Sequence, residues 1–167
     1  MSHTPLVDLV LLREGWRSQG RRLILTNGVF DLLHAGHVNY LNLARGMGDV
    51  LVVALNSDAS TRALKGERRP LVSATDRATL LAGLRAVDYV TIFEERTAEA
   101  VVAALQPDYY VKGGDYGPGP DGVLDLTRLP EARVVHTYGG QVALVPFSEG
   151  RSTSALIALI AERYRAG

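Results

Sequence analysis

Short apolar runs alternate with longer segments of helical spacing along the chain. Six of the runs are rich in Val, Ile and Leu and mostly apolar on successive positions, a pattern typical of strands buried on both faces. We therefore expect strands at RLILT (22–26), DVLVVALN (49–56), DYVTIF (88–93), DYYVKG (108–113), ARVVHTY (132–138) and QVALVPF (141–147).

Helices are predicted between these runs and at both ends of the chain. The expected helices cover about 5–20, 37–47, 73–87, 97–105 and 152–165. Ser73 stands three residues before Asp76 as in a capping box, and Thr97 is the expected N-cap of its helix. The last helix places its apolar side chains on one stripe, formed by Leu156, Ile157, Ile160 and Tyr164.

The alternation of strands and helices predicts an α/β fold. We expect a single Rossmann-like, doubly wound parallel sheet of about five strands with helices on both faces. One domain is expected over 1–167, with an N-terminal helix at about 5–20 and a core at about 22–167, and the Gly- and Pro-dense segment 113–122 is interpreted as a loop. Ligands of such sheets bind at the carboxyl ends of the strands, so the chemistry is expected in the segments that follow them.

Composition narrows the class of partner. The chain has 167 residues, 47% of them hydrophobic, and a formal net charge of zero, so it can bury a core but offers no basic arm for nucleic acid or an anionic membrane. It has no cysteine, which excludes disulfides, a thiol nucleophile and a zinc–thiolate site. We find no basic leader before the first apolar stretch and no segment of membrane-spanning length. We therefore expect a cytoplasmic protein with a small-molecule partner.

The first strand is followed by TNGVFDLLHAGH (26–37), which carries two histidines three residues apart. Gly28 would allow a sharp turn with positive φ, and Gly36 would allow a ligand to approach the backbone closely. If a helix begins near His34, the imidazoles of His34 and His37 share a face at its positive end, where an anion is favoured. Two other interpretations stay open, namely a capping histidine beside a core histidine, and a metal pair that lacks a third ligand nearby.

The chain has only two lysines against sixteen arginines, and both follow strands. Lys65 is expected in a polar, mobile segment after the second strand, and Lys112 at the end of the fourth. A lysine is a compact point charge suited to a phosphoryl group, although both side chains could also be ordinary surface lysines. Ser152, Thr153 and Ser154 open the last helix, as a second anion site or simply as an N-cap.

Five segments in this order resemble the cytidylyltransferase-like nucleotidyltransferases: TNGVFDLLHAGH, NSD after the second strand, TDRATLLAGLRAVD, VKGGDY and EGRSTS. The resemblance covers the chain from about Leu23 onward. It implies that His34 and His37 of the H-x-G-H signature contact nucleotide phosphates and that Lys65 neutralises charge at the reacting phosphorus. The remaining nucleotide-binding residues are expected to be Asn27, Gly28, Val29, Phe30, Gly36, Asn56, Lys112, Gly113, Ser152, Thr153 and Ser154. Substrate-binding or supporting roles are expected for Asp31, Arg77 and Asp115.

Within the family, the segments LKGERRP, VKGGDY and GGQV are most similar to enzymes that transfer AMP from ATP to D-glycero-β-D-manno-heptose 1-phosphate. The alternatives are a glycerol-3-phosphate cytidylyltransferase and a nucleotide-binding module without turnover. The resemblance further implies Mg²⁺ bound with ATP, a homodimer, and a separate sugar kinase upstream. The residues GPGPDGVLDLTRLPEA (117–132) depart from the heptose pattern, and the metal ligands are not identified by the sequence.

Overall fold

The computed structural model describes residues 3–113, 129–145 and 153–164. Five parallel strands form one sheet in the order β3-β2-β1-β4-β5. The order reverses between β1 and β4, which makes the crevice at their carboxyl ends the expected ligand site. The strands are β1 (Leu23–Gly28), β2 (Val50–Asn56), β3 (Tyr89–Phe93), β4 (Tyr109–Gly113) and β5 (Gln141–Val145).

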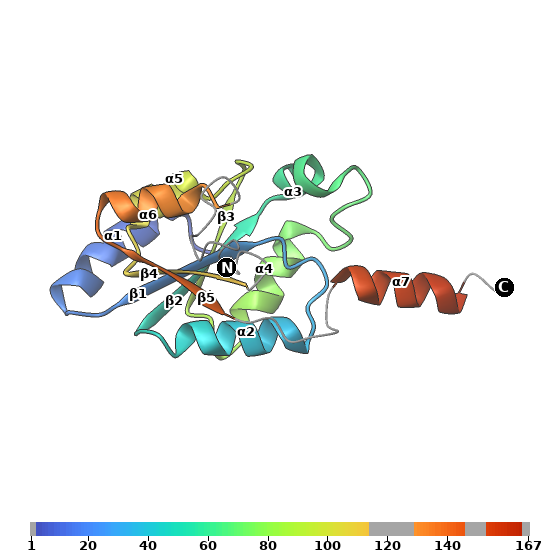
Figure 1. Ribbon diagram of the computed structural model, residues 1–167, viewed down its shortest axis with the longest axis horizontal. Coiled ribbons are helices and arrows are strands. Elements are labelled where there is room, and N and C mark those ends of the chain that lie inside the picture. Colours follow the sequence, from blue (N-terminus) through green and yellow to red (C-terminus); the bar gives the residue numbers. More distant parts are fainter. Residues whose placement is uncertain (1–2, 114–128, 146–152, 165–167) are drawn as a thin grey trace, which may run out of the picture.

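Helices cover both faces of the sheet. The described helices are α1 (Leu6–Ser18), α2 (Ala35–Arg45), α3 (Asp58–Lys65), α4 (Ala74–Ala82), α5 (Glu99–Leu105), α6 (Glu131–Thr137) and α7 (Thr153–Tyr164). Figure 1 shows α5 and α6 above the strands and α2 below them. The predicted doubly wound α/β fold is therefore confirmed. Among the described residues, no helix combines the length and the apolar character that a membrane crossing requires.

Alternate residues of the strands supply the two cores. Leu23 and Leu25 face a core with α1, α5 and α6, whereas Ile24 between them faces a second core with α2 and α4. The same alternation continues along β2, every residue of which is buried. A strand with a helix layer on each side needs apolar residues at every position, which is why its sequence is an unbroken apolar run.

An aspartate stands just before three of the strands and holds the neighbouring strand in register. Each carboxylate accepts a hydrogen bond from a backbone N–H at or just before the start of the adjacent strand. The pairs are Asp49 with the N–H of Arg22 (2.8 Å), Asp88 with Leu51 (2.7 Å) and Asp108 with Leu23 (2.7 Å). Because these N–H groups lie where the ladder begins, the aspartates satisfy donors that the sheet leaves unpaired.

The expected strand ARVVHTY (132–138) is wrong, because these residues lie mostly in α6. Pro130 is the N-cap with helical backbone angles, and Ala132 and Val135 are buried three residues apart with exposed Arg133 between them. That spacing is helical. A short apolar run does not distinguish a strand from a buried helix, and here Pro130 and Gly139 limited the segment to two helical turns.

Two of the predicted helix starts are confirmed, one is wrong, and helix α3 was not predicted. Ser73 caps α4 as predicted, since its side chain accepts a hydrogen bond from the Asp76 N–H. His34 is the N-cap of α2, close to where the helix was expected to begin. Thr97 is not the N-cap of α5; that residue is Ala98, because the Thr97 hydroxyl donates to Glu99 instead. The polar segment after β2, expected to be mobile, begins as helix α3, capped by Ser57.

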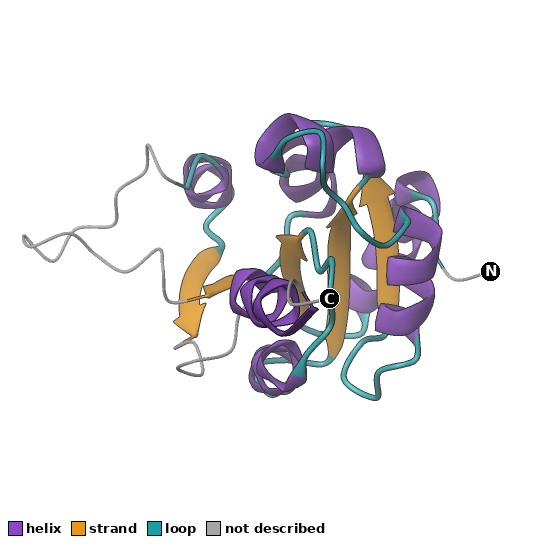
Figure 2. Ribbon diagram, turned by 90° about the vertical axis from the view of Figure 1, so that its right-hand side faces the viewer, coloured by secondary structure: helices purple, strands orange, loops and turns teal. Residues whose placement is uncertain are grey.

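Helix α7 lies apart from the two layers. It projects from the body in Figure 1 and is seen nearly end-on in Figure 2. None of its residues is buried, and Ile160 and Tyr164 of the predicted apolar stripe are 53% and 82% exposed. At the beginning of the helix, the Thr153 hydroxyl donates to the Leu32 carbonyl.

The close packing of the turn before β2 yields a stability prediction. A Cβ added at Gly48 would lie 2.0 Å from Ile24 Cδ1 and 2.9 Å from the Arg22 carbonyl oxygen, whereas nothing lies within 4 Å of one added at Gly15. We expect Gly48→Ala to lower the free energy of unfolding by about 1–3 kcal/mol. The control Gly15→Ala, inside α1, should raise it by roughly 0.5–1 kcal/mol. Urea unfolding of both variants measures the difference, and equal stability would contradict the packing described here.

Candidate active site

A cavity of about 650 Å³ opens at the carboxyl ends of β1, β2 and β4, where the strand order predicts a ligand. Most of the predicted site residues that the structure describes line it. They are Asn27, Gly28, Val29, Phe30, Asp31, His37, Asn56, Lys65, Lys112, Gly113, Thr153 and Ser154. His34, Gly36 and Arg77 are not among its lining residues. Ser152 and Asp115 lie outside the described residues.

The two histidines of the signature lie together at the start of α2. Their rings stack with centroids 3.9 Å apart, and the Phe30 ring lies 5.2 Å from that of His37. His34 makes no side-chain cap hydrogen bond, so the interpretation as a capping histidine is not supported. The buried Nδ1 of His37 has no hydrogen-bond partner among the described residues, as expected where a ligand supplies the partner.

Burial, together with the charge of His34, lowers the pKa of His37 from its ordinary 6.5 to about 4. At neutral pH His37 is therefore an uncharged imidazole with one N–H donor. Two stacked imidazolium ions would repel each other, so the pair is suited to hydrogen bonding with an anion rather than to charge neutralisation. Positive charge in the cavity must come from other residues.

Phe30 rather than Gly28 adopts the unusual backbone angle after β1. Phe30 has a φ of 48°, whereas Gly28 is not among the residues with positive φ, which corrects the expected turn at Gly28. Space at Gly28 is limited, because a Cβ there would lie 3.0 Å from the Phe30 ring and that ring would have to shift slightly. The left-handed angle at a bulky residue is backbone strain located at a ligand cavity, as is common at functional sites.

Lys112 brings a buried ammonium group to the cavity. Its Nζ donates to Asn27 Oδ1 at 2.9 Å, and the Tyr110 hydroxyl donates to the same oxygen. Lys112 is 9% exposed, and this burial lowers its pKa to about 8, against the raising effect of the Glu131 carboxylate. Lys112 thus keeps most of its charge near pH 7 while lying in a poorly solvated position.

Lys65 is exposed and lines the cavity from the end of α3. It is the last residue of α3, and the helix ends there because Gly66 has a φ of 92°, which favours glycine. The side chain can therefore move while its backbone is held by the helix. The two lysines differ in this respect, since Lys112 is held by Asn27 and Lys65 forms no ion pair with a described residue.

Asp31 is committed to the loop between α3 and α4. It is 2% exposed, pairs with the Arg69 guanidinium, and accepts hydrogen bonds from the Leu71 and Val72 N–H groups at 2.7 and 3.0 Å. Because its two oxygens already accept from these three donors, Asp31 has few acceptor positions left for a metal. The described residues contain no cluster of three or more His, Cys, Asp or Glu side chains that could hold a metal ion.

Arg77 is fully buried and binds the chain segments that surround the cavity. Its guanidinium donates to three backbone carbonyls and one carboxylate, which belong to three separate segments around the strand ends. The acceptors are the carbonyls of Val29 (2.6 Å), Asn56 (2.9 Å) and Val72 (2.8 Å), and Asp58 Oδ1 (2.7 Å). Arg77 therefore positions the loops after β1 and β2 and does not line the ligand cavity.

Several lining residues were missed by the sequence prediction. They are Tyr40, Leu64, Arg69, Arg96, Thr97, Pro130 and Glu131. Arg96 and Thr97 follow β3, so the rule that ligands bind beyond strand ends could have identified them. Tyr40 lies one helical turn after His37 and donates to the Val111 carbonyl at 2.8 Å. No local signal marks Glu131, because it enters the cavity only through the placement of α6.

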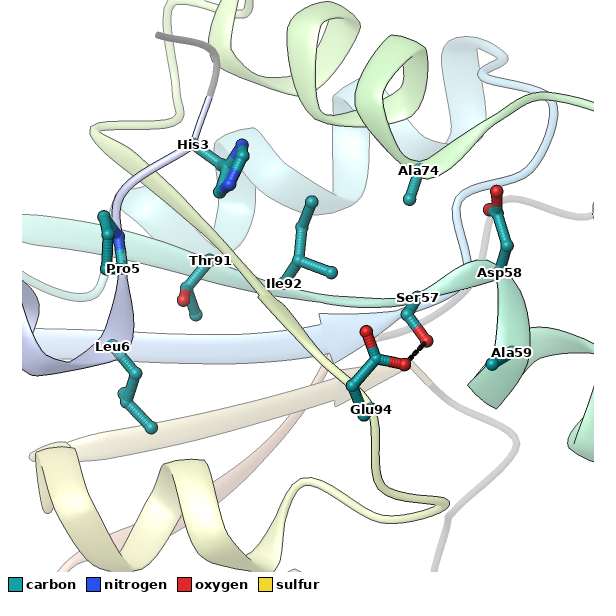
Figure 3. Close-up of a pocket in the computed structure, with 10 residues that line it drawn as sticks. All are labelled: His3, Pro5, Leu6, Ser57, Asp58, Ala59, Ala74, Thr91, Ile92 and Glu94. Atoms are coloured by element: carbon teal, nitrogen blue, oxygen red, sulfur yellow. Dashed lines mark hydrogen bonds between the residues drawn. The ribbon is translucent and has the colours of Figure 1, made fainter.

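A second depression of about 650 Å³ lies elsewhere, at the N-terminal segment, β3 and the starts of α3 and α4 (Figure 3). It contains none of the predicted site residues. Its carboxylates are already engaged, since Glu94 accepts from the Ser57 hydroxyl and Asp58 pairs with Arg77. Because the two depressions are equal in size, chemistry decides between them, and the donors converge on the first.

A parallel sheet with two histidines at a helix start and two lysines around the strand ends defines an α/β protein whose candidate site is the cavity at the carboxyl ends of its strands. The comparison with family models agrees, since the model described as Cytidylyltransferase-like matches residues 25–157. The chain belongs to the cytidylyltransferase-like family.

Relatives of this chain are longer proteins. It is 51% identical over 156 residues to the bifunctional protein HldE of Pelobacter propionicus, covering 93% of this chain and 30% of that protein. It is also 51% identical over 142 residues to the bifunctional protein HldE of Wolinella succinogenes, covering 85% and 27%. The chain thus spans less than a third of these relatives.

A solved structure has a similar fold. It is described as the lipopolysaccharide core biosynthesis protein from Thermoplasma volcanium and is 30% identical to this chain. The two superpose with a TM-score of 0.59, and the match covers 79% of this chain and 100% of that one.

The burial of Arg77 yields a prediction about stability. Arg77→Met keeps the volume but leaves three carbonyl groups without their donor, so we expect a loss of about 3–5 kcal/mol in the free energy of unfolding. The control is Arg22→Met, whose guanidinium forms an exposed pair with Asp49 at 3.8 Å. That change should cost less than about 1 kcal/mol. Denaturant unfolding compares the two, and similar losses would show that Arg77 does not support the site.

The lowered pKa of His37 yields a pH prediction. The folded state binds a proton at His37 less readily than the unfolded state, so its contribution to stability is present above pH 6.5 and is lost as the pH falls toward about 4. We expect the free energy of unfolding to fall less steeply across this range in His37→Gln than in the wild type. His136→Gln, at an exposed position of α6, is the control and should follow the wild-type curve.

Proposed function

We propose that this chain is a nucleotidyltransferase that transfers AMP from ATP to D-glycero-β-D-manno-heptose 1-phosphate, giving ADP-heptose and pyrophosphate. One observation carries the proposal: His37, Lys65, Lys112 and the start of α7 line one cavity, so that donors and positive charge converge on a single volume. Such a site fits a polyphosphate. Membership of the cytidylyltransferase-like family supports transfer of a nucleotidyl group.

The choice of heptose follows from the resemblance of the segments LKGERRP, VKGGDY and GGQV to enzymes that activate heptose. The similarity to HldE proteins and to a lipopolysaccharide core biosynthesis protein is consistent with an activated sugar as product. The sugar 1-phosphate would be supplied by a sugar kinase. The family resemblance also leads us to propose a cytoplasmic homodimer, which light scattering would test by a mass twice that of the chain.

The proposed reaction is an in-line displacement at the α-phosphorus of ATP. A phosphate oxygen of the sugar 1-phosphate forms the new bond to this phosphorus while the bond to the bridging oxygen of pyrophosphate breaks. The attacking oxygen is already anionic, so no general base is required. Catalysis then consists of positioning and of stabilising the charge that develops on the phosphate oxygens.

The residues of the cavity have different roles in this reaction. Neutral His37, stacked on His34, donates a hydrogen bond to a phosphate oxygen. Lys65 closes onto the triphosphate from the end of α3, and Lys112 holds bound substrate from the buried side. Mg²⁺ would be carried by the triphosphate and partly neutralise it and the departing pyrophosphate.

Pyrophosphate release tests the proposed substrates. We expect ATP with heptose 1-phosphate to turn over faster than any pairing that contains CTP or glycerol 3-phosphate. Faster turnover of CTP with glycerol 3-phosphate would favour a glycerol-3-phosphate cytidylyltransferase instead. Binding of ATP without pyrophosphate release in any pairing would favour a nucleotide-binding module.

The different settings of the two lysines yield a kinetic prediction. Lys65 is mobile and acts mainly in the transition state, so Lys65→Ala should lower kcat by about 10²–10³ with little change in KM. Lys112 is held in the unliganded site, so Lys112→Ala should mainly raise a KM. Lys65→Arg should rescue poorly, because a planar guanidinium differs in shape from an ammonium. Steady-state kinetics measures these effects, with exposed Arg62→Ala on the same helix as the control.

Wild-type kcat in Lys65→Ala would contradict its catalytic role. A fall in kcat of the same size in Arg62→Ala would attribute the effect to α3 itself rather than to the lysine.

A further inference from the structure

A buried carboxylate in the cavity has no part in the proposed phosphate chemistry. Glu131, the first residue of α6, is 4% exposed and lines the cavity beside Pro130. Burying an ionised carboxylate is costly unless it is paired and hydrogen-bonded. A negative charge is also unfavourable in a cavity that is to receive a triphosphate. Glu131 is therefore suited to bind a ligand group other than phosphate.

Among the residues that the structure describes, only one of the two carboxylate oxygens accepts a hydrogen bond. Oε1 accepts a hydrogen bond from the Ala98 N–H at 2.9 Å, which fixes the orientation of the group. Oε2 makes no hydrogen bond with any described residue. An ionised carboxylate can accept about four hydrogen bonds, so Glu131 keeps strong acceptor capacity for a bound molecule.

Donors lie on the same side of the cavity. Lys112 and Glu131 line the same cavity, and the charge of Glu131 raises the pKa of Lys112 against the effect of burial. Lys112 donates to Asn27 Oδ1, and so does the Tyr110 hydroxyl. Because that oxygen takes two donors, the Asn27 amide nitrogen is directed away from them, and it donates to no described residue.

A fixed acceptor beside an ammonium group and an amide donor matches a vicinal diol. Each hydroxyl can donate to a carboxylate oxygen and accept from a neighbouring donor, whereas a phosphate could only accept and would be repelled by Glu131. We propose that Glu131 is a specificity-determining residue that binds a vicinal diol of a substrate, either the ribose of the nucleotide or the ring of the acceptor sugar. This inference rests on the proposed function, since both proposed substrates carry such diols.

A purely structural role for Glu131 predicts a different result. If the carboxylate served only to bind the Ala98 N–H, its replacement would change stability but not the preference between substrates. Glu131→Gln separates the roles, because the amide oxygen can still accept from Ala98 while the NH₂ group stands where Oε2 was. An acceptor for a hydroxyl then becomes a donor, with almost no change in volume.

The experiment compares the wild type, Glu131→Gln and the control Glu14→Gln, which makes the same chemical change at an exposed position of α1. Affinities for ATP, 2′-deoxy-ATP, 3′-deoxy-ATP and heptose 1-phosphate are measured by calorimetry, and KM values by pyrophosphate release. Ratios between ligands do not depend on the fraction of folded protein. A charged hydrogen bond contributes about 1.5–3 kcal/mol, so a loss of about 10–100-fold is expected.

Two results support the proposal and identify the source of the diol. If the ribose is bound, the wild type prefers ATP over a deoxy analogue about tenfold or more, and Glu131→Gln loses that preference. If the acceptor sugar is bound, Glu131→Gln weakens heptose 1-phosphate while the discrimination between ATP and its deoxy analogues persists. Wild-type ratios for all four ligands, or the same changes in Glu14→Gln, would overturn the proposal.

A failure of the proposed function would be detected by a different measurement from the one that tests Glu131. It would appear as an absence of pyrophosphate release by the wild type in every pairing. The calorimetric ratios would still decide the role of Glu131 in that case, because they require binding and not turnover.

Discussion

The arrangement of the site depends on one buried cation. Arg77 is fully buried, and its guanidinium binds the carbonyls of Val29, Asn56 and Val72 and the carboxylate of Asp58. These acceptors belong to the loops after β1 and β2 and to the starts of the next two helices. A planar group with five fixed donors can join several chain segments at set angles, which a lysine cannot do. The positions of the H-x-G-H segment and of α3 relative to each other follow from this contact.

The electrostatics of the cavity follow from unequal burial of its cations and bases. Stacking and burial keep His37 neutral, burial brings the pKa of Lys112 to about 8, and Lys65 remains in solvent at the end of a helix. The site thus combines a neutral donor, a buried ammonium held by Asn27, and an exposed ammonium. A polyanion that binds there has few charged partners of these groups to displace. Its negative charge raises the pKa values of the groups and so favours their protonated forms.

Much of the fold was predictable because its strands are buried on both faces. Five of the six expected strands are present, since Val- and Ile-rich runs such as VLVVALN are required where helices cover both sides of a sheet. The exception, at 132–138, is a short amphipathic helix whose apolar run resembles a strand over this length. The predicted N-cap of α5 was wrong, because the Thr97 hydroxyl donates to Glu99. The positive φ predicted at Gly28 was also wrong, because Phe30 adopts it and the Phe30 ring packs close to Gly28.

The sequence by itself determined the class of fold and the strand ends that bear the candidate site, because these depend on local periodicity and on residue types at short spacing. The family was indicated by the resemblance of five sequence segments. Only the tertiary structure decided which of those residues share a cavity and in what state. The burial that lowers the pKa of His37 comes from packing, and the pairing of Asp31 with Arg69 and the position of Glu131 in the cavity with Lys112 join segments distant in the chain. Burial and pairing are properties of the packed molecule, and no local pattern of residues encodes them.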